Sequence, residues 1–315
     1  MHPTHRPIPQ KTDLIQNDRP KRVWRRVNGV LLLDKPNGLT SNAALQTVRR
    51  LFSAAKAGHT GTLDPMATGL LPLCFGEATK FSADLLEADK TYEAEVCFGI
   101  TTDTGDADGT VLERRPANVD RTQLEAVLSQ FRGPILQVPP MYSALKRDGQ
   151  PLYRLARQGV EVERAAREVT IRELLVIDAT PNSCRLRVTC SKGTYIRTLA
   201  EDIGRALQCG AHLSALRRMA VGALTLARSV TLTQLNELPE DGRAQYLLPP
   251  DALLQSLPAV DLDGALAVRF AHGNPVDMPG HGAGKCRVYF DGQLLGVGLA
   301  DNAGRIHPSR LVSAV

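Results

Sequence analysis

The 315-residue sequence lacks three features that mark secreted, membrane or zinc-ribbon proteins. Its six cysteines form no Cys-x-x-Cys pair, which argues against a zinc ribbon or a disulfide framework and favours a reducing environment. No apolar run approaches the roughly 20 residues that a membrane helix needs. The N-terminus is polar and proline-rich, so no signal peptide is indicated. We therefore expect a soluble protein of the cytoplasm.

Common cofactor and nucleophile motifs are also missing. The sequence has no metal-ligand spacing, no phosphate-binding P-loop, no dinucleotide fingerprint and no Ser–His–Asp pattern. His59, His272 and His281 are isolated from other ligand types. The inventory favours chemistry by a carboxylate without a metal or cofactor, which narrows the class of enzyme but not the reaction.

The positive charge is concentrated at the N-terminus. Residues 1–26 carry seven Lys or Arg against two Asp, a net charge of +5 that equals the net charge of the whole chain. Such a basic flexible arm can attract nucleic-acid phosphates in a salt-sensitive way. A charged tail that only keeps the protein in solution explains the composition equally well.

Consecutive strands with inserted helices predict an α+β fold. Strands are expected at 30–33, 92–98, 169–177, 185–190, 213–216 and 222–226, and helices from Thr40 or Ser41, from Thr122, over 152–158 and from 196. The prolines at 249, 250 and 258 indicate a domain boundary. Beyond it, Asp291-Gly292 between two apolar runs predicts a hairpin within a small β-barrel-like domain.

Three places could carry chemistry. Asp64 lies in a glycine-punctuated segment, 58–69, where it could act as nucleophile or base or could only organise a turn. Arg197 follows a predicted strand-to-helix junction and could hold a carboxylate ionised or form an ordinary surface ion pair. Tyr92, on an alternating strand, could stack on a base or belong to the core.

Several longer motifs resemble the bacterial tRNA pseudouridine synthase B family. They occur in the family's order: 28–36 (NGVLLLDKP), 57–69 (AGHTGTLDPMATG), 76–80 (GEATK), 103–109 (DTGDADG), 140–146 (PMYSALK), 190–197 (CSKGTYIR) and 210–218 (GAHLSALRR). The tail resembles, more loosely, the PUA-like RNA-binding domain of this family. The basic arm before Asn28 is not part of the pattern.

The resemblance implies a pseudouridine synthase fold with a mixed, largely antiparallel central sheet and flanking helices. It divides the chain into a basic arm (1–26), a catalytic domain (27–250) and a PUA-like domain (256–315), and implies a monomer that needs no cofactor. The implied activity is isomerisation of uridine 55 in the T-loop of tRNA, after the nucleotide has been flipped out of its stack.

The resemblance also implies roles for individual residues. Asp64 matches the catalytic aspartate and Arg197 the arginine that pairs with it. Tyr92 matches the tyrosine that stacks on the target base. The remaining matches are Tyr195, near base and sugar; His59, in the space vacated by flipped nucleotides; Leu216, lining the base pocket; and Lys35 and Pro36, a support beneath the site.

Two alternatives remain open from the sequence. A noncatalytic RNA-binding protein or tRNA folding chaperone would also use a basic arm and an RNA-binding tail, although it has no need of Asp64 together with Arg197. A pseudouridine synthase acting on another RNA would share the motifs.

Overall fold

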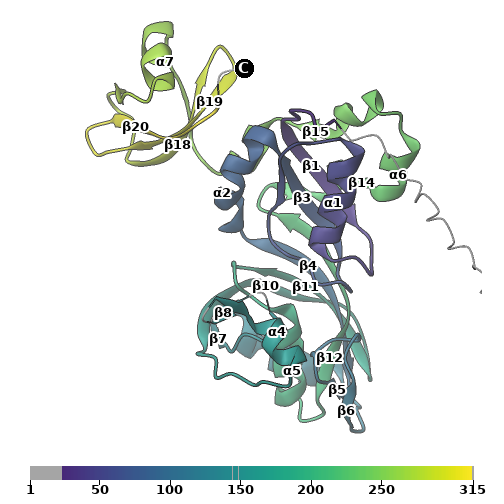
Figure 1. The fold of residues 1–315 in the computed structure, drawn as a ribbon. Helices are drawn as coiled ribbons and strands as arrows, with labels where there is room; N and C mark the ends of the chain where they lie inside the picture. Colours follow the sequence, from purple (N-terminus) through teal and green to yellow (C-terminus); the bar gives the residue numbers. More distant parts are fainter. Residues whose placement is uncertain (1–22, 144, 148, 314–315) are drawn as a thin grey trace, which may run out of the picture.

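The computed structural model describes residues 23–143, 145–147 and 149–313 (Figure 1). Most of the predicted basic arm, residues 1–22, lies outside the described residues. The α-helices are α1 (Ser41–Leu51), α2 (Ser82–Leu86), α3 (Arg121–Leu128), α4 (Leu152–Arg157), α5 (Ile196–Ala206), α6 (Leu232–Glu237) and α7 (Gly264–Ala271). None of the described helices has the length and apolar character that crossing a bilayer requires.

A large mixed sheet forms the body of the molecule. Its strands are β1 (Gly29–Lys35), β2 (Ala57–His59), β3 (Thr68–Phe75), β4 (Lys90–Phe98), β7 (Gly133–Gln137), β10 (Arg167–Thr180), β11 (Ser183–Cys190), β12 (Ala211–Val221), β13 (Leu224–Thr225), β14 (Val230–Thr231) and β15 (Leu247–Leu248). The main path runs β14-β1-β3-β12-β4-β11-β10-β7, parallel at β14/β1 and β3/β12 and antiparallel elsewhere. The expected α+β fold with a largely antiparallel central sheet is confirmed.

The burial of β1 and β4 follows from what covers each face. Leu31 and Leu33 of β1 pack into the main core, while Val30 and Leu32 pack into a second cluster on the opposite face. Because both faces are covered, β1 is a continuous apolar run rather than an alternating one. Along β4, Tyr92 and the alternate residues after it are buried in the main core, as the alternating sequence predicts.

Two small hairpins extend from the body: β5 (Ile100–Thr102) with β6 (Val111–Arg114), and β8 (Lys146–Arg147) with β9 (Gln150–Pro151). The predicted helix from Thr122 is α3, but its cap is Asp120, whose side chain accepts from the Gln123 N–H in a capping box. The strands expected at 213–216 and 222–226 are also corrected. The first belongs to the longer β12, which bends at two irregularities in its pairing with β4, and only Leu224 and Thr225 of the second form a strand.

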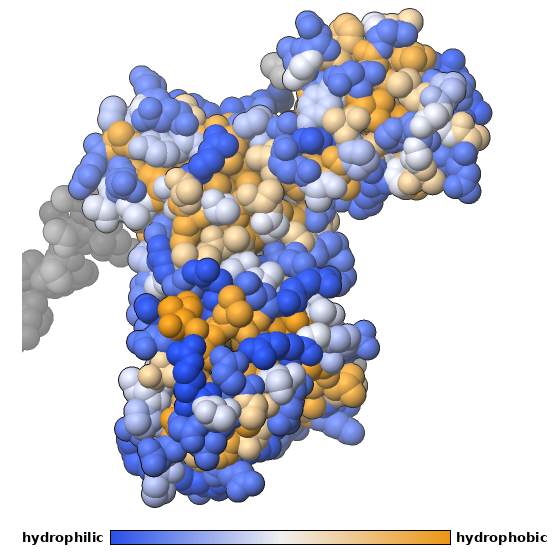
Figure 2. Space-filling view, turned by 180° about the vertical axis from the view of Figure 1, so that it is seen from behind, coloured by the Kyte–Doolittle hydropathy of each residue, from blue (hydrophilic) through white to orange (hydrophobic). Residues whose placement is uncertain are grey.

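The C-terminal residues form a second sheet with a core of its own. It contains β16 (Ala259–Asp261), β17 (Val276–Asp277), β18 (Gly284–Phe290), β19 (Gln293–Ala300) and β20 (Arg305–Leu311). The predicted hairpin joins β18 to β19, and Asp291 and Gly292 both have positive φ, as a tight turn requires. Seen from the other side, this sheet stands out from the body as a separate lobe (Figure 2).

The lobe is attached to the body beside α2. Val297 of β19 is buried in the second cluster together with Leu253 and Leu254. Lys80, just before α2, donates to the Leu311 carbonyl at 3.0 Å, and Lys285 pairs with Asp84 of α2 at 2.8 Å. Apolar burial and polar contacts together fix the lobe against the same segment that leads into β4.

Candidate active site

Asp64 lies in the loop between β2 and β3, which is anchored from below. The buried Ser41 hydroxyl donates to the Leu63 carbonyl at 3.0 Å and accepts from the Leu63 N–H at 2.8 Å. The Lys35 ammonium donates to the carbonyls of Pro36, Leu39 and Pro65 at 2.9, 2.6 and 3.3 Å. Burial lowers the pKa of Lys35 to about 8, opposed by the negative charge of Asp64. Lys35 is thus beneath the site, while Pro36 is exposed on the surface.

Arg197, in the first turn of α5, forms an ion pair with Asp64. Its Nε lies 3.0 Å from Asp64 Oδ2 and 3.5 Å from Asp106 Oδ2. Its two terminal nitrogens donate to the carbonyls of Thr104 and Tyr142 at 2.8 and 2.7 Å. The arginine side chain is only 5% exposed whereas that of Asp64 is 38% exposed, so this is not an ordinary surface ion pair. The guanidinium is held rigidly and presents one edge to the carboxylate.

Two opposing influences set the pKa of Asp64. Burial raises it above the ordinary aspartate value and is the larger influence, followed by the positive charge of Arg197, which lowers it. Asp106 adds a further rise. The carboxylate is therefore more basic than a free aspartate, and Arg197 limits that increase.

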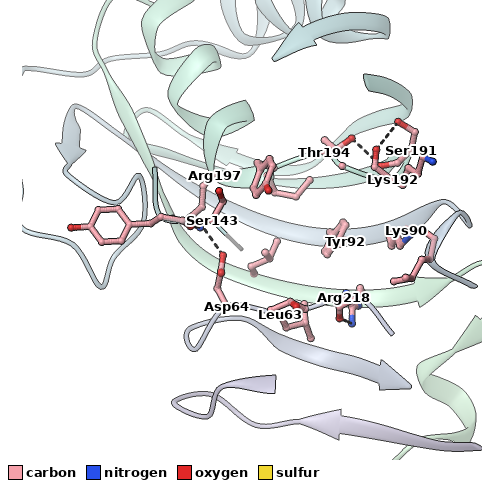
Figure 3. Close-up of a pocket in the computed structure, with 18 residues that line it drawn as sticks. Leu63, Asp64, Lys90, Tyr92, Ser143, Ser191, Lys192, Thr194, Arg197 and Arg218 are labelled. Carbon is pink, nitrogen blue, oxygen red and sulfur yellow. Dashed lines mark hydrogen bonds and ion pairs between the residues drawn. The ribbon is translucent and has the colours of Figure 1, made fainter. Parts of the chain in front are cut away.

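Five of the residues singled out in the sequence line one cleft with a volume of about 300 Å³: Asp64, Tyr92, Tyr195, Arg197 and Leu216 (Figure 3). Their strands explain the grouping, because Tyr92 of β4 is directly opposite Arg218 of β12, and Ala94 is opposite Leu216. Every second residue of a strand points to the same face of the sheet, and so do the residues directly opposite it on the neighbouring strand. The Tyr92 ring is buried in the core and also faces the cleft, so the two readings of this residue do not exclude each other.

His59 is one of three sequence-predicted residues outside the cleft lining. It ends β2 and is absent from the cleft lining. Its Nδ1 is buried without a hydrogen-bond partner, and burial lowers the pKa of the imidazole. The structure therefore brings together all of the predicted site residues except His59, Lys35 and Pro36, which lie on the supporting segments.

Sequence reasoning missed Gln137, at the end of β7. Its side chain is buried, with Nε2 donating to the Tyr195 carbonyl at 3.0 Å and Oε1 accepting from the Tyr195 N–H at 2.7 Å. Tyr195 is the N-cap residue of α5 and has no side-chain cap of its own. The amide of Gln137 thus fixes the backbone two residues before Arg197. Its place three residues before the 140–146 motif was the only signal in the sequence.

Asp106, Lys90 and Arg218 were also not singled out as site residues. Asp106 belongs to the aspartate-rich 103–109 motif, which could have suggested a second carboxylate. Lys90 shares the alternating face of Tyr92, and Arg218 ends the 210–218 motif. Within the described part of the chain, no group of three or more His, Cys, Asp or Glu side chains could hold a metal ion.

Comparison with known proteins covers nearly all of the folded chain. Three family models match: the N-terminal domain of TruB family pseudouridylate synthase over residues 49–196, the tRNA pseudouridylate synthase B C-terminal domain over 197–255, and the C-terminal domain of pseudouridine synthase II TruB over 258–312. The tRNA pseudouridine synthase B of Dechloromonas aromatica (strain RCB) is 62% identical over 292 residues, covering 93% of this chain and 98% of that protein. The corresponding protein of Aromatoleum aromaticum is 57% identical, covering 92% and 94%.

Solved structures share the fold at lower identity. A crystal structure of a Cbf5–Nop10–Gar1 complex aligns with a TM-score of 0.71 at 24% identity, covering 93% of this chain and 90% of that one. An H/ACA RNP bound to a substrate RNA containing 2′-deoxyuridine aligns with a TM-score of 0.69 at 23% identity, covering 91% and 85%. At this level of identity the likeness concerns the fold.

Proposed function

Because the chain belongs to the TruB family of pseudouridine synthases, we propose that it isomerises uridine 55 in the T-loop of tRNA, with Asp64 as the catalytic carboxylate. Membership gives the general reaction, which is the conversion of uridine to pseudouridine in tRNA by an isomerase. The position in the tRNA and the residue roles are the finer part of the proposal.

The observation that supports the role of Asp64 is its ion pair with Arg197 at the edge of a cleft that Tyr92 also lines. The cleft volume of about 300 Å³ suits a single extruded nucleotide rather than a stem-loop. Flipping a base out of its stack costs a few kcal/mol. Stacking on an aromatic ring such as Tyr92 offsets about 1–3 kcal/mol of that cost.

The reaction breaks the bond from C1′ of the ribose to N1 of uracil and forms a bond from C1′ to C5. C5 then loses its proton and N1 gains one, so the product is an isomer of the substrate. Ionised Asp64 either attacks the base or sugar as a nucleophile or removes a proton to start cleavage, and both routes need the carboxylate charged. Arg197 lowers the pKa of Asp64 against the effect of burial. Tyr195 and Leu216 line the same cleft and would confine the uracil while it turns.

The remaining assignments concern the RNA around the target and the support of the Asp64 loop. His59, at the end of β2 with an unpartnered Nδ1, would occupy the space that the flipped nucleotides leave. Lys35 and Pro36 would support the Asp64 loop from below. The C-terminal sheet would serve as the PUA-like RNA-binding domain, and the protein would act as a monomer on the T-arm in the cytoplasm.

The test is to incubate unmodified tRNA with the protein, label pseudouridine with carbodiimide and locate the label by mass spectrometry. We expect one modified uridine, at position 55, and no product from a T-arm RNA with cytidine there. Asp64→Asn should abolish turnover yet leave tRNA affinity within about tenfold, since phosphate contacts supply most of the binding energy. Asp178→Asn, at an exposed position on β10, is the matched control and should react normally.

Product formation by Asp64→Asn would contradict the assignment of the carboxylate. Modification at another uridine would contradict position 55 and favour a different RNA target. RNA binding by the wild-type protein without any modification would favour the noncatalytic RNA chaperone.

A further inference from the structure

The cleft that contains Asp64 has a second, positively charged end. It is lined by Lys90 and Lys192, on the far side of Tyr92 from Asp64 and Arg197, and by Arg218 beside Tyr92 (Figure 3). Lys90 precedes Tyr92 by two residues on the same face of β4, a displacement of about 7 Å along the strand. Arg218 lies opposite Tyr92 on β12. The two ends of one cleft therefore differ in charge.

Two of these cations are buried without a counter-ion. Lys90 is 8% exposed, and its ammonium donates to the carbonyls of Leu86 and Ala88, both at 2.6 Å. Arg218 is 1% exposed, and its guanidinium donates to the carbonyls of Leu70 and Gly61 at 2.7 and 3.0 Å. Neither forms an ion pair with a carboxylate of the described residues. Burial of unpaired charge is unfavourable, and carbonyl dipoles offset it only in part.

The carboxylates nearest to Lys90 are engaged elsewhere. Glu87 pairs with Lys192 at the exposed rim of the cleft, and Asp89 pairs with Arg172 at 2.9 Å. Burial lowers the pKa of Lys90 and the positive charge of Arg218 lowers it further, while Cys190, Glu87 and Asp89 oppose the change without cancelling it. An anion placed between Lys90 and Arg218 would offset both the burial of their charges and the repulsion between them.

We propose that Lys90, Arg218 and Lys192 form a binding site for a backbone phosphate of the RNA strand that enters the cleft. The inference rests on the proposed function, because it requires an RNA strand with its target base against Tyr92. A phosphate carries the missing negative charge and accepts several hydrogen bonds, which suits two lysines and an arginine. An added Cβ at Gly193 would meet no atom within 4 Å, so the rim beside Lys192 is open to the strand.

The first experiment measures the affinity of a T-arm stem-loop RNA over a range of salt concentrations. Each lost phosphate contact makes the slope of log affinity against log salt shallower by about 0.7 for a single strand. We expect this change in Lys90→Met, which keeps the apolar stem, and in the exposed Lys192→Met. Arg121→Met removes the same charge from an exposed position on α3 outside the cleft lining and should keep the wild-type slope.

The second experiment changes the RNA and leaves the protein intact, so it does not depend on how a variant folds. Single phosphates around the target uridine are replaced one at a time by neutral methylphosphonates. We expect one replacement to weaken binding by wild-type protein and to cause no further loss in Lys192→Met, because both changes remove the same contact.

Three results would overturn the phosphate site: unchanged slopes in both lysine variants, no sensitive phosphate near the target, or additive losses in the combined test. A slower reaction with unchanged affinity and slope would also overturn it and would place the cations against the uracil instead. In each case continued pseudouridine formation by wild-type protein would leave the proposed function standing, whereas its absence would refute that function separately.

Discussion

Replacement of Gln137 by leucine tests how the start of α5 is held. The Gln137 side chain is 2% exposed and binds both the N–H and the carbonyl of Tyr195, at 2.7 and 3.0 Å. Leucine has a similar size but can make neither bond. Leaving a buried polar group unsatisfied costs about 1–3 kcal/mol, so two such groups predict a loss of about 2–4 kcal/mol in the free energy of unfolding, allowing for partial access of water to Tyr195.

The change should also affect catalysis, because Arg197 follows Tyr195 by two residues and holds Asp64 at 3.0 Å. We expect kcat to fall at least tenfold with a smaller change in KM, measured by pseudouridine formation, while urea denaturation gives the stability. Leu32→Ala is the matched control: Leu32 is buried on the sheet face away from the cleft, and its truncation costs a similar 2–5 kcal/mol. That variant should lose stability but keep its kcat below its melting temperature.

Gln137→Glu separates positioning from general damage. An ionised glutamate can accept the Tyr195 N–H but cannot donate to the Tyr195 carbonyl, whereas the protonated form can do both. The activity of Gln137→Glu relative to wild type should therefore rise as the pH falls. Normal kcat in Gln137→Leu, or a relative activity of Gln137→Glu that is independent of pH, would refute the reasoning.

The remaining predictions concern Tyr92 and Asp64. Tyr92→Leu should slow single-turnover pseudouridine formation while Tyr92→Phe stays close to wild type, because stacking needs the ring and not the hydroxyl; equal rates for all three would make Tyr92 a core residue only. Since the pKa of Asp64 is raised, activity should fall with decreasing pH before the ordinary aspartate range near pH 4 is reached, and a rate profile flat down to that range would contradict this. The same raised pKa means that ionised Asp64 destabilises the folded state, so Asp64→Asn should melt at a higher temperature than wild type at neutral pH. This difference should shrink as the pH falls through the raised folded-state pKa and should be gone below the unfolded-state pKa. An Asp64→Asn variant that melts lower at pH 7 would show that the ion pair with Arg197 outweighs burial.

The sequence allowed the local elements to be predicted where one physical signal dominates. The alternation around Tyr92 gave β4, and Asp291-Gly292 gave the C-terminal hairpin, because each depends on residues close in the chain. The extent of β12 was not predictable, since its bends arise from pairing with β4 across more than a hundred residues. The cap of α3 was misplaced because Thr122 and Asp120 are both good capping residues and only the backbone geometry selects one.

The candidate site was predictable only in part for a similar reason. Asp64 and Arg197 were found because their motifs are long and distinctive, but their separation of 3.0 Å is a property of the folded chain. Gln137 acts through the backbone of Tyr195, and an isolated glutamine carries no signal for such a contact. Arg218 and Lys90 were overlooked because a surface location is the ordinary expectation for cations.

The seam between the C-terminal lobe and the body has a practical consequence for anyone who shortens this chain. Val297 of the lobe packs in the same apolar cluster as Leu253 and Leu254 of the body. A protein that ends before residue 256 would therefore expose Leu253 and Leu254 to solvent. Exposed apolar patches of this kind promote self-association. The shortened protein, residues 1–255, should therefore aggregate unless Leu253 and Leu254 are replaced by polar residues. This holds even though the body and the lobe each have a hydrophobic core of their own.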